Sequence, residues 1–296
     1  MPSPKRLQVL VAMDGSPASK AAVDTVVRFP WSDSTRVGGV VAVGTAHFRL
    51  QSKSLDEVLK SSLEQATGSA HDVLTSRWPG AEVAVIDEAP IEAILGEARR
   101  VHAGVIALGW RGHGTFRRLL AGSVSRAVAA RANCAVLVAR TAPKVVNRFV
   151  IGYDDGPNSR RAVQLLSRLV PGRDSKVVLV TIIEPVNPLA GRAARLPAAV
   201  RSTVRSRIAA VNAERLEKAL ATLETAATRL RNIGWNTETE LLSGSPLPAL
   251  LTAARVHDGD VLIVGARETS GVERALLGSV AEGVLNNSRM PVLIVR

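Results

Sequence analysis

The sequence predicts an α/β fold of two tandem domains, each with a doubly wound sheet of five parallel strands. Three observations support this prediction. The chain has 296 residues, a length that suits about two domains. One pattern of residues occurs twice, and within each copy short apolar runs alternate with helical stretches. We expect the first domain over residues 1–143 and the second over residues 144–296.

The repeat is carried by three pairs of matching segments. Asp14 lies in the segment VAMDGSPASKAAV, and Asp154 lies in the matching segment IGYDDGPNSRRAV, 140 positions later. The other pairs, each 156 positions apart, are Pro90 with Pro246 and Gly122-Ser123 with Gly278-Ser279. The second copy therefore has about sixteen extra residues in its middle. We assign them to a loop over 185–197 and to a long basic helix over 198–231.

Strands are expected where Val, Ile, Leu and Ala follow one another almost without interruption, as in strands buried on both faces of a parallel sheet. These runs are 7–13, 37–43, 81–87, 105–108 and 135–138, then 149–153, 177–183, 237–242, 261–264 and 292–295. Helices of the first copy are expected over 19–29, 54–76, 90–100 and 123–131. Ser19 and Ser123 are candidate N-caps, and Pro90 suits a first helical turn.

Charge and aromatic content bear on possible partners. The chain has 38 basic and 26 acidic residues, for a net charge of +12, but aromatic residues make up only 3%. Few stacking platforms for single-stranded nucleic acid are therefore available. We interpret the excess charge as a solvated basic surface and do not expect nucleic acid. For Arg201, Arg205 and Arg207 of the long helix, a partner or nucleic acid stays open as the alternative.

The sequence gives no indication of a membrane span, a signal peptide, a metal site or a catalytic site. No apolar run approaches the ~20 residues that cross a bilayer, and the apolar run before Asp14 is too short for a signal peptide. Cys134 is a single cysteine, so we expect a reducing, cytoplasmic location and a small buried residue there. The five histidines show no metal-ligand spacing, and no nucleophile, base and orienting group stand out together, so no metal or catalytic residue is expected.

A glycine-rich loop follows the fourth predicted strand. Its glycines follow the pattern Gly109-x2-Gly112-x9-Gly122-Ser123, and Arg111 lies inside it. Ligands of open α/β sheets bind beyond the carboxyl ends of the strands, where the winding reverses. There the amides at the start of the next helix, with the Ser123 hydroxyl and Arg111, would bind an anion such as a chain of phosphates. Asp14, at the end of the first strand, would accept hydrogen bonds from ribose hydroxyls.

Two common nucleotide motifs are absent from the sequence. No glycine-rich run ends in Gly-Lys-Ser/Thr, and no compact GxGxxG pattern follows the first strand. These absences argue against a P-loop NTPase and against a nicotinamide dehydrogenase.

The spaced glycine motif and the opening segment around Asp14 resemble the universal stress protein family, and the duplication resembles its tandem two-domain form. The resemblance implies an adenine nucleotide α-hydrolase-like fold and a regulatory role in the stress response, with at most slow hydrolysis of ATP. It implies ATP as the ligand, optionally with magnesium, and pairing of the two domains through their last strands, with a homodimer as a further option. The nucleotide-binding residues that it implies are Ala12, Asp14, Val43, Leu108, Gly109, Arg111, Gly112, Gly122, Ser123, Val124 and Ser125.

The second copy departs from the motif. Glu268 stands where the second glycine belongs. A carboxylate about 5 Å from a phosphate costs ~3 kcal/mol at an effective dielectric of about 20, or roughly a hundredfold in affinity. We therefore expect one ATP site and one degenerate site. The sequence leaves ADP, AMP or a cyclic nucleotide open as the ligand. Two other functions stay open as alternatives, an adenine-nucleotide-using enzyme and a basic interaction module that binds no nucleotide.

Overall fold

The computed structural model describes residues 6–43, 68, 71–110, 122–185, 197–266 and 277–296. In these residues the strands form one continuous sheet in the order β3-β2-β1-β4-β5-β10-β9-β6-β7-β8. The first half contributes β1 (Gln8–Met13), β2 (Arg36–Ala42), β3 (Val83–Ile86), β4 (Val105–Gly109) and β5 (Ala135–Ala139). The second half contributes β6 (Arg148–Gly152), β7 (Lys176–Ile183), β8 (Asn236–Ser243), β9 (Val261–Gly265) and β10 (Val292–Val295).

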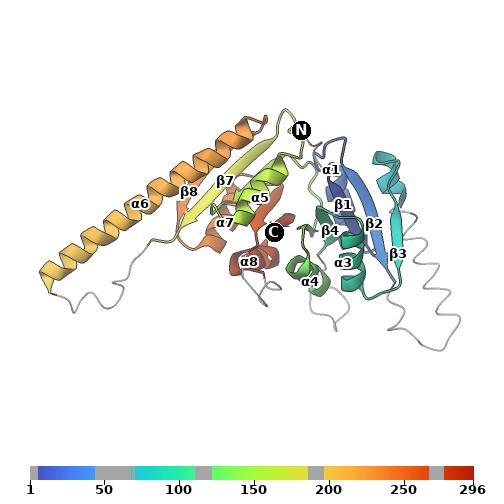
Figure 1. Ribbon diagram of the computed structural model, residues 1–296, viewed down its shortest axis with the longest axis horizontal. Coiled ribbons are helices and arrows are strands. Elements are labelled where there is room, and N and C mark those ends of the chain that lie inside the picture. The colour runs from blue at the N-terminus through green and yellow to red at the C-terminus, as the bar shows by residue number, and fades with distance from the viewer. Residues whose placement is uncertain (1–5, 44–67, 69–70, 111–121, 186–196, 267–276) are drawn as a thin grey trace.

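Each half of the sheet is parallel, and the two halves meet in an antiparallel pair. β1 lies between β2 and β4, and β6 lies between β7 and β9. At the centre β5 and β10 run antiparallel, with Leu137 opposite Leu293 and Val136 opposite Ile294. The prediction of two doubly wound five-stranded parallel sheets is confirmed, and the structure adds that they form one ten-stranded sheet (Figure 1).

Helices cover both faces of the sheet (Figure 1). One face packs against α1 (Pro17–Arg28), α5 (Pro157–Leu166), the last part of α6 (Ala198–Arg231) and a short helix over residues 71–77. The other face packs against α3 (Pro90–Arg100), α4 (Ser123–Arg131), α7 (Pro246–Val256) and α8 (Ser279–Asn287). Most of the helix expected over 54–76 lies outside the described residues.

The strands alternate between two hydrophobic cores. In β1, Val9 and Val11 join the core on the α1 side, whereas Leu10 and Ala12 join the core on the α3 side. This alternation follows from the two-residue period of a β-strand. Because both faces are covered, all the buried positions of this strand, from Val9 to Met13, are apolar, which is the pattern that the sequence displays.

The core on the α1 side crosses the boundary between the halves. Phe29, at the end of α1, stacks on Trp31 with ring centroids 4.5 Å apart and meets Phe149 of β6 edge-on at 5.6 Å. Phe149 in turn lies 5.4 Å from Trp235. The backbone amide of Val170 donates to the carbonyl of Pro30 at 2.8 Å, which adds a direct link between the halves. The two halves are therefore packed as one body on this face.

Polar contacts link α4 to α8 on the other face. Arg126 of α4 lies 3.9 Å from the carboxylate of Glu282 in α8, and it donates to Asn286 at 3.0 Å. Arg126 and Glu282 occupy equivalent positions of the repeat, 156 residues apart. The pseudo-twofold axis of the molecule therefore brings two equivalent positions with opposite charges together.

Both predicted N-caps are wrong, although the helix expected over 123–131 is found at those bounds as α4. The N-cap of α1 is Ser16, whose hydroxyl accepts the Ser19 amide, so Ser19 lies inside the first turn. The N-cap of α4 is Gly122, and Ser123 is the first helical residue. In both cases the chain turns tightly just before the helix, and a propensity argument does not locate such a turn. Pro90 does begin α3, as predicted.

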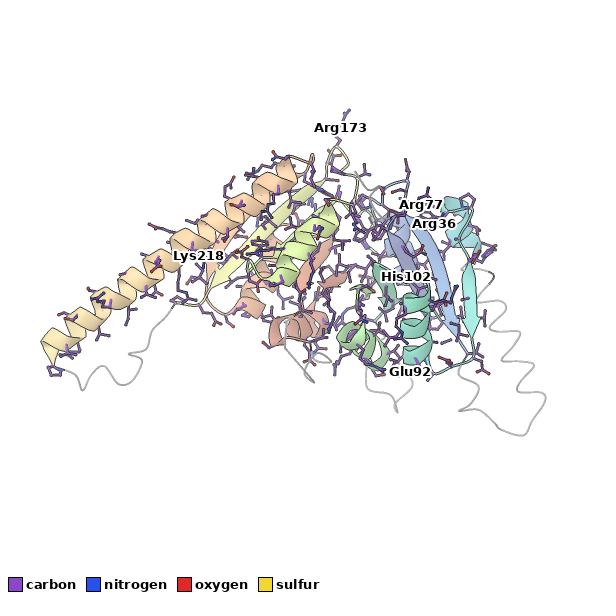
Figure 2. All side chains as sticks on the ribbon, in the orientation of Figure 1. Arg36, Arg77, Glu92, His102, Arg173 and Lys218 are labelled. Atoms are coloured by element: carbon purple, nitrogen blue, oxygen red, sulfur yellow. The ribbon has the colours of Figure 1, made fainter. Side chains whose placement is uncertain are left out.

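The basic surface is spread over both halves. Arg36, Arg77, Arg173 and Lys218 are exposed and lie on different elements of the molecule (Figure 2). The long helix α6 extends well beyond the sheet (Figure 1), and among its described side chains none before Leu223 is buried. Arg205 and Arg207 are exposed on that projecting part, while Arg201 is half-buried. These four exposed basic residues are therefore distributed over both halves, two in each.

Replacing Phe149 by Ala should destabilise both halves together. Its ring is fully buried and contacts aromatic groups of both halves, so we expect a loss of about 3–5 kcal/mol in the free energy of unfolding. Urea denaturation followed by tryptophan fluorescence measures this loss. Val145→Ala, at a side chain that is 56% exposed, is the control and should change stability by less than about 0.5 kcal/mol. An unfolding curve with two steps, of which only one moves, would contradict the shared core.

Candidate functional site

The candidate site lies where the winding of the first half reverses. The chain passes from β1 to β2 on one side and reaches β4 on the other side of β1. The carboxyl ends of these strands place Asp14, Val43 and Gly109 along one edge of the sheet. This is the place where open α/β sheets bind ligands.

A tight turn presents Asp14 at the end of β1. Its carboxylate accepts the Ser16 amide at 3.0 Å, and Gly15 has a φ of +71° between them. Glycine adopts this left-handed conformation without cost. The Asp14 side chain is exposed, whereas Ala12 is buried in β1 and Val43 is half-buried just after β2. The turn thus fixes the carboxylate at the surface of the sheet edge.

Gly109 is required by helix packing. A Cβ atom at this position would lie 2.2 Å from the backbone carbon of Ala18 in α1. No side chain fits at that distance, so the first turn of α1 rests directly on the end of β4. The family resemblance implied that Gly109 binds nucleotide, and the structure adds a packing reason for a glycine at this position. Leu108, just before it, is buried in β4.

The start of α4 has the backbone amides that an anion site would use. Gly122, its N-cap, has a φ of +72°, and within the described residues no side chain caps this helix end. The first amides of a helix have no partner inside the helix and carry the positive end of its dipole. Ser123 and Val124 are half-buried in this turn, and the Ser125 hydroxyl donates to the Gly109 carbonyl at 2.6 Å. That bond joins α4 to the end of β4.

Arg111 and Gly112 lie outside the described residues, as does the rest of the loop over 111–121. The structure does bring Asp14, Gly109, Gly122 and Ser125 to one edge of the sheet, in agreement with the placement expected from the motif. It places no ligand on them, so their roles in binding remain predictions.

Sequence reasoning missed one residue of this region. Trp110 is only 6% exposed and packs so closely on Gly122 that a Cβ atom there would lie 2.7 Å from the indole. The guanidinium of Arg140 covers the same ring, 4.4 Å from its centroid. The sequence did offer a signal for Trp110, since a tryptophan inside the glycine motif is unusual in a chain with only 3% aromatic residues. Its contact with Arg140 could not be predicted, because the two residues are distant in sequence.

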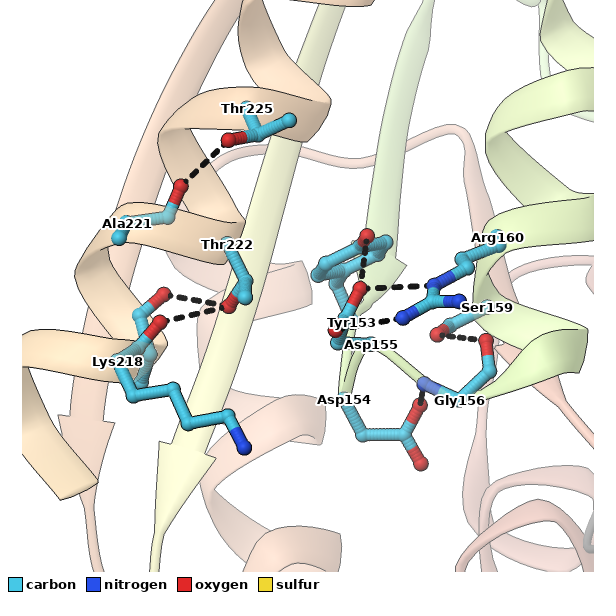
Figure 3. A network of polar contacts seen from close by, with 11 residues as sticks. Tyr153, Asp154, Asp155, Gly156, Ser159, Arg160, Lys218, Ala221, Thr222 and Thr225 are labelled. Carbon is cyan, nitrogen blue, oxygen red and sulfur yellow. Dashed lines mark hydrogen bonds and ion pairs between the residues drawn. The ribbon is translucent and has the colours of Figure 1, made fainter.

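The second half builds the same turn with different chemistry (Figure 3). Asp154 accepts the Gly156 amide at 2.9 Å, as Asp14 accepts that of Ser16. Asp155 takes the place of Gly15 and keeps the left-handed conformation, with a φ of +59°. A non-glycine residue in this conformation carries strain of about 1 kcal/mol or more, which the surroundings must offset.

Asp155 is held by two neighbours. It accepts both a two-pronged bond from Arg160, at 2.9 and 2.8 Å, and the Tyr153 hydroxyl at 2.9 Å. The hydrogen bond from Arg160 holds the pKa of the Asp155 carboxyl below its usual value. Burial, and then the bond to Asp155, raises the pKa of Tyr153 to about 12. This network, shown in Figure 3, stiffens the turn that is a simple glycine turn in the first half.

A second side chain distinguishes the two sites. Asn158 stands where the first half has Ala18, and its amide donates to the Ala266 carbonyl at the end of β9. Its oxygen accepts a bond from Arg161 at 2.6 Å. In the second half a side-chain hydrogen bond therefore joins the start of α5 to the end of β9. Glu268 lies outside the described residues, so the expected clash with phosphate stays a prediction.

Other candidate chemistry is limited in the described part of the chain. No group of three His, Cys, Asp or Glu side chains there could hold a metal ion. No described helix is long and apolar enough to cross a membrane. Cys134 is half-buried, and burial raises the pKa of its thiol to about 11, so it is protonated at neutral pH.

Replacing Gly122 by Ala should destabilise the protein more than the equivalent change at Gly278. Both glycines are helix N-caps, but Gly278 has a φ of −64°, which any residue adopts. Gly122→Ala adds the left-handed penalty and a clash with Trp110, so we expect an excess loss of about 1–2 kcal/mol. Denaturant unfolding of both variants measures the difference. Equal losses would mean that the strain at Gly122 is absent.

The single tyrosine allows a direct test of the network in the second half. Absorbance at 295 nm should show Tyr153 titrating at about 12 in the folded protein and at about 10 in denaturant. Because the folded pKa is the higher one, the tyrosine's contribution to stability is complete below pH ~10 and is lost as the pH rises toward 12. Asp155→Asn should lower the folded value partway, since burial is the larger cause. A folded pKa at the denatured value would contradict the network.

Comparisons with known proteins identify the family. The model of the universal stress protein family matches residues 6–140 and again residues 146–296. A universal stress protein of Methanocaldococcus jannaschii is 28% identical over 159 residues, which cover 54% of this chain and 87% of that protein. One from Thermus aquaticus is 32% identical over 133 residues, covering 45% of this chain and 97% of that protein. A solved universal stress protein from Archaeoglobus fulgidus, 17% identical, shares the fold with a TM-score of 0.69 over 97% of this chain and 95% of its own. The chain belongs to the universal stress protein family, as two tandem copies of its domain.

Proposed function

We propose that this protein is an ATP-binding regulator of the stress response that holds the nucleotide in its first half. The observation that supports this most directly is the convergence of three parts of one motif. The Asp14 turn, the end of β4 at Gly109 and the start of α4 at Gly122, which no described side chain caps, meet at the edge where the winding reverses. Members of this fold class bind ligands at that edge.

Each part would contact a different portion of the nucleotide. An ionised carboxylate has about four acceptor sites, so Asp14 can bind the Ser16 amide and still accept ribose hydroxyls. The amides of Ser123, Val124 and Ser125 would bind phosphate oxygens. Val43 donates its amide to Ile86 at 2.9 Å, so a contact with adenine would use its carbonyl. Arg111 would add a positive charge beside the phosphates.

The residues present fit ATP without a dedicated metal site. Magnesium usually reaches proteins with the nucleotide, coordinated by phosphates and by only one or two carboxylates. In our proposal any magnesium would enter bound to the phosphates, with Asp14 as a nearby carboxylate in the described site.

The second half is proposed as the degenerate site. Asp154 keeps the turn, but the Tyr153, Asp155 and Arg160 network and the Asn158 hydrogen bond replace the glycine turn and bare backbone contact of the first half. Glu268 adds a carboxylate to the loop that would meet phosphate. These three differences together support one tight site per chain.

The test compares Asp14→Ala with Asp154→Ala by isothermal titration calorimetry. Both changes remove the hydrogen bond to the amide two residues further on, of 3.0 and 2.9 Å, so each variant loses the equivalent turn contact. Loss of a charged acceptor costs about 1.5–3 kcal/mol, so Asp14→Ala should weaken ATP binding roughly 10- to 100-fold. Asp154→Ala should bind as the wild type does, with one ATP per chain.

The same titrations with ADP, AMP and cyclic AMP, each with and without magnesium, identify the preferred nucleotide. Two equal sites per chain would contradict the degenerate second half. An Asp14→Ala variant with wild-type affinity, or a wild type that binds none of the four nucleotides, would contradict the proposed function.

A further inference from the structure

Arg140 makes direct contacts with both halves of the molecule. It follows β5, and its Nη2 donates to the carbonyls of Leu285 and Asn286 at 2.7 and 2.9 Å. These carbonyls belong to the last turn of α8, where helix carbonyls have no partner inside the helix and the dipole is negative. The Arg140 guanidinium of the first half thus caps the C-terminal carbonyls of α8 in the second half.

The same guanidinium also lies on the glycine motif. It covers the indole of Trp110 at 4.4 Å from the ring centroid, and Trp110 packs against Gly122, the N-cap of α4. An unbroken series of contacts therefore runs from the end of α8, through Arg140 and Trp110, to the helix start that would bind phosphate. Burial lowers the pKa of Arg140, in keeping with a guanidinium partly removed from water.

The repeat supplies a matched residue, Arg296, in a half that has no tryptophan at the position equivalent to Trp110. Arg296, 156 positions after Arg140, donates to the carbonyls of Ala129 and Ala130 at 3.1 and 2.7 Å, in the last turn of α4. These carbonyls match those of Leu285 and Asn286, so the two arginines form reciprocal bonds across the junction. Where Arg140 covers Trp110, however, the second half has Ala266. Both arginines therefore donate to helix carbonyls across the junction, but among the residues that the structure describes only Arg140 has a tryptophan beneath its guanidinium.

We propose that Arg140 is a positioning residue that couples nucleotide binding in the first half to the junction between the halves. It holds Trp110 against the start of α4 while it is anchored to α8. Coupling between two sites is reciprocal, so a nucleotide on α4 should strengthen the junction as much as the junction strengthens binding. This inference depends on the proposed function, since it concerns the same site.

The experiment compares Arg140→Gln with Arg296→Gln. Both variants lose the bonds to helix carbonyls, so both should lower the midpoint of thermal unfolding without ATP, and Arg140→Gln should lower it further because it also loses the contact with Trp110. Only Arg140→Gln also releases Trp110, so it alone should weaken ATP binding, by about 5- to 10-fold in calorimetry. It should likewise show a smaller rise of the unfolding midpoint on addition of saturating ATP.

A second pair keeps the test valid if either variant fails to fold. Arg140→Lys and Arg296→Lys retain a charge that can donate to the carbonyls, but lysine lacks the planar group that stacks on an indole. Arg140→Lys should weaken ATP binding severalfold, and Arg296→Lys should not. The Trp110→Phe variant keeps an aromatic ring on which Arg140 can stack. Adding Arg140→Lys to this variant should therefore weaken its ATP binding further.

The outcomes separate the two proposals. If the wild type binds ATP and the Arg140 and Arg296 variants have equal affinities, the coupling role of Arg140 is wrong and the proposed function stands. If the wild type binds no nucleotide, the proposed function is wrong and this inference is wrong with it. Weaker binding in the Arg140 variants alone supports both.

Discussion

The antiparallel pairing of β5 with β10 is the constraint on which the rest of this structure depends. Each half ends its own sheet with an apolar strand, and a strand edge of this kind has unpaired backbone groups that invite association. Pairing the two edges removes both from solvent and continues the hydrogen bonding across ten strands. It also brings α4 against α8 and Phe29 against Phe149, so that the cores on both faces become continuous.

The two halves show how one scaffold supports different sites. Their strands, registers and helix order agree, and both have an aspartate that caps the turn after the first strand. The differences lie within a few residues of that turn, at Gly15 against Asp155, Ala18 against Asn158 and Trp110 against Ala266. At the first two positions the first half leaves backbone at the sheet edge and the second half places side chains there, whereas at the third the first half has the large Trp110 side chain and the second half has Ala266.

The sequence predicted the inner strands well because they are buried on both faces, so burial alone dictates a run of apolar residues such as that from Val9 to Met13. The N-caps were less accurate, because tight turns at Ser16 and Gly122 decide where the helices begin. The motif predicted that Asp14, Gly109 and Gly122 lie together at one edge of the sheet, and the structure has them there. It could not identify Trp110 and Arg140 as partners, because their contact depends on packing across the junction. Nor could it show that Gly109 is required by α1.

The opposite charges of Arg126 and Glu282 favour pairing of the first half with the second half over pairing of either half with a copy of itself. These residues sit at equivalent places beside the axis, 3.9 Å apart. If two first halves from different chains associated in the same way, Arg126 would approach another Arg126, and two second halves would oppose Glu282 with Glu282. Like charges at such a distance repel, although solvent and salt moderate the effect at these half-exposed positions. In a duplicated chain the two equivalent positions can therefore carry opposite charges, so that the first half pairs with the second half in preference to a copy of itself. A symmetric dimer of identical single domains has the same residue at both positions and cannot do this.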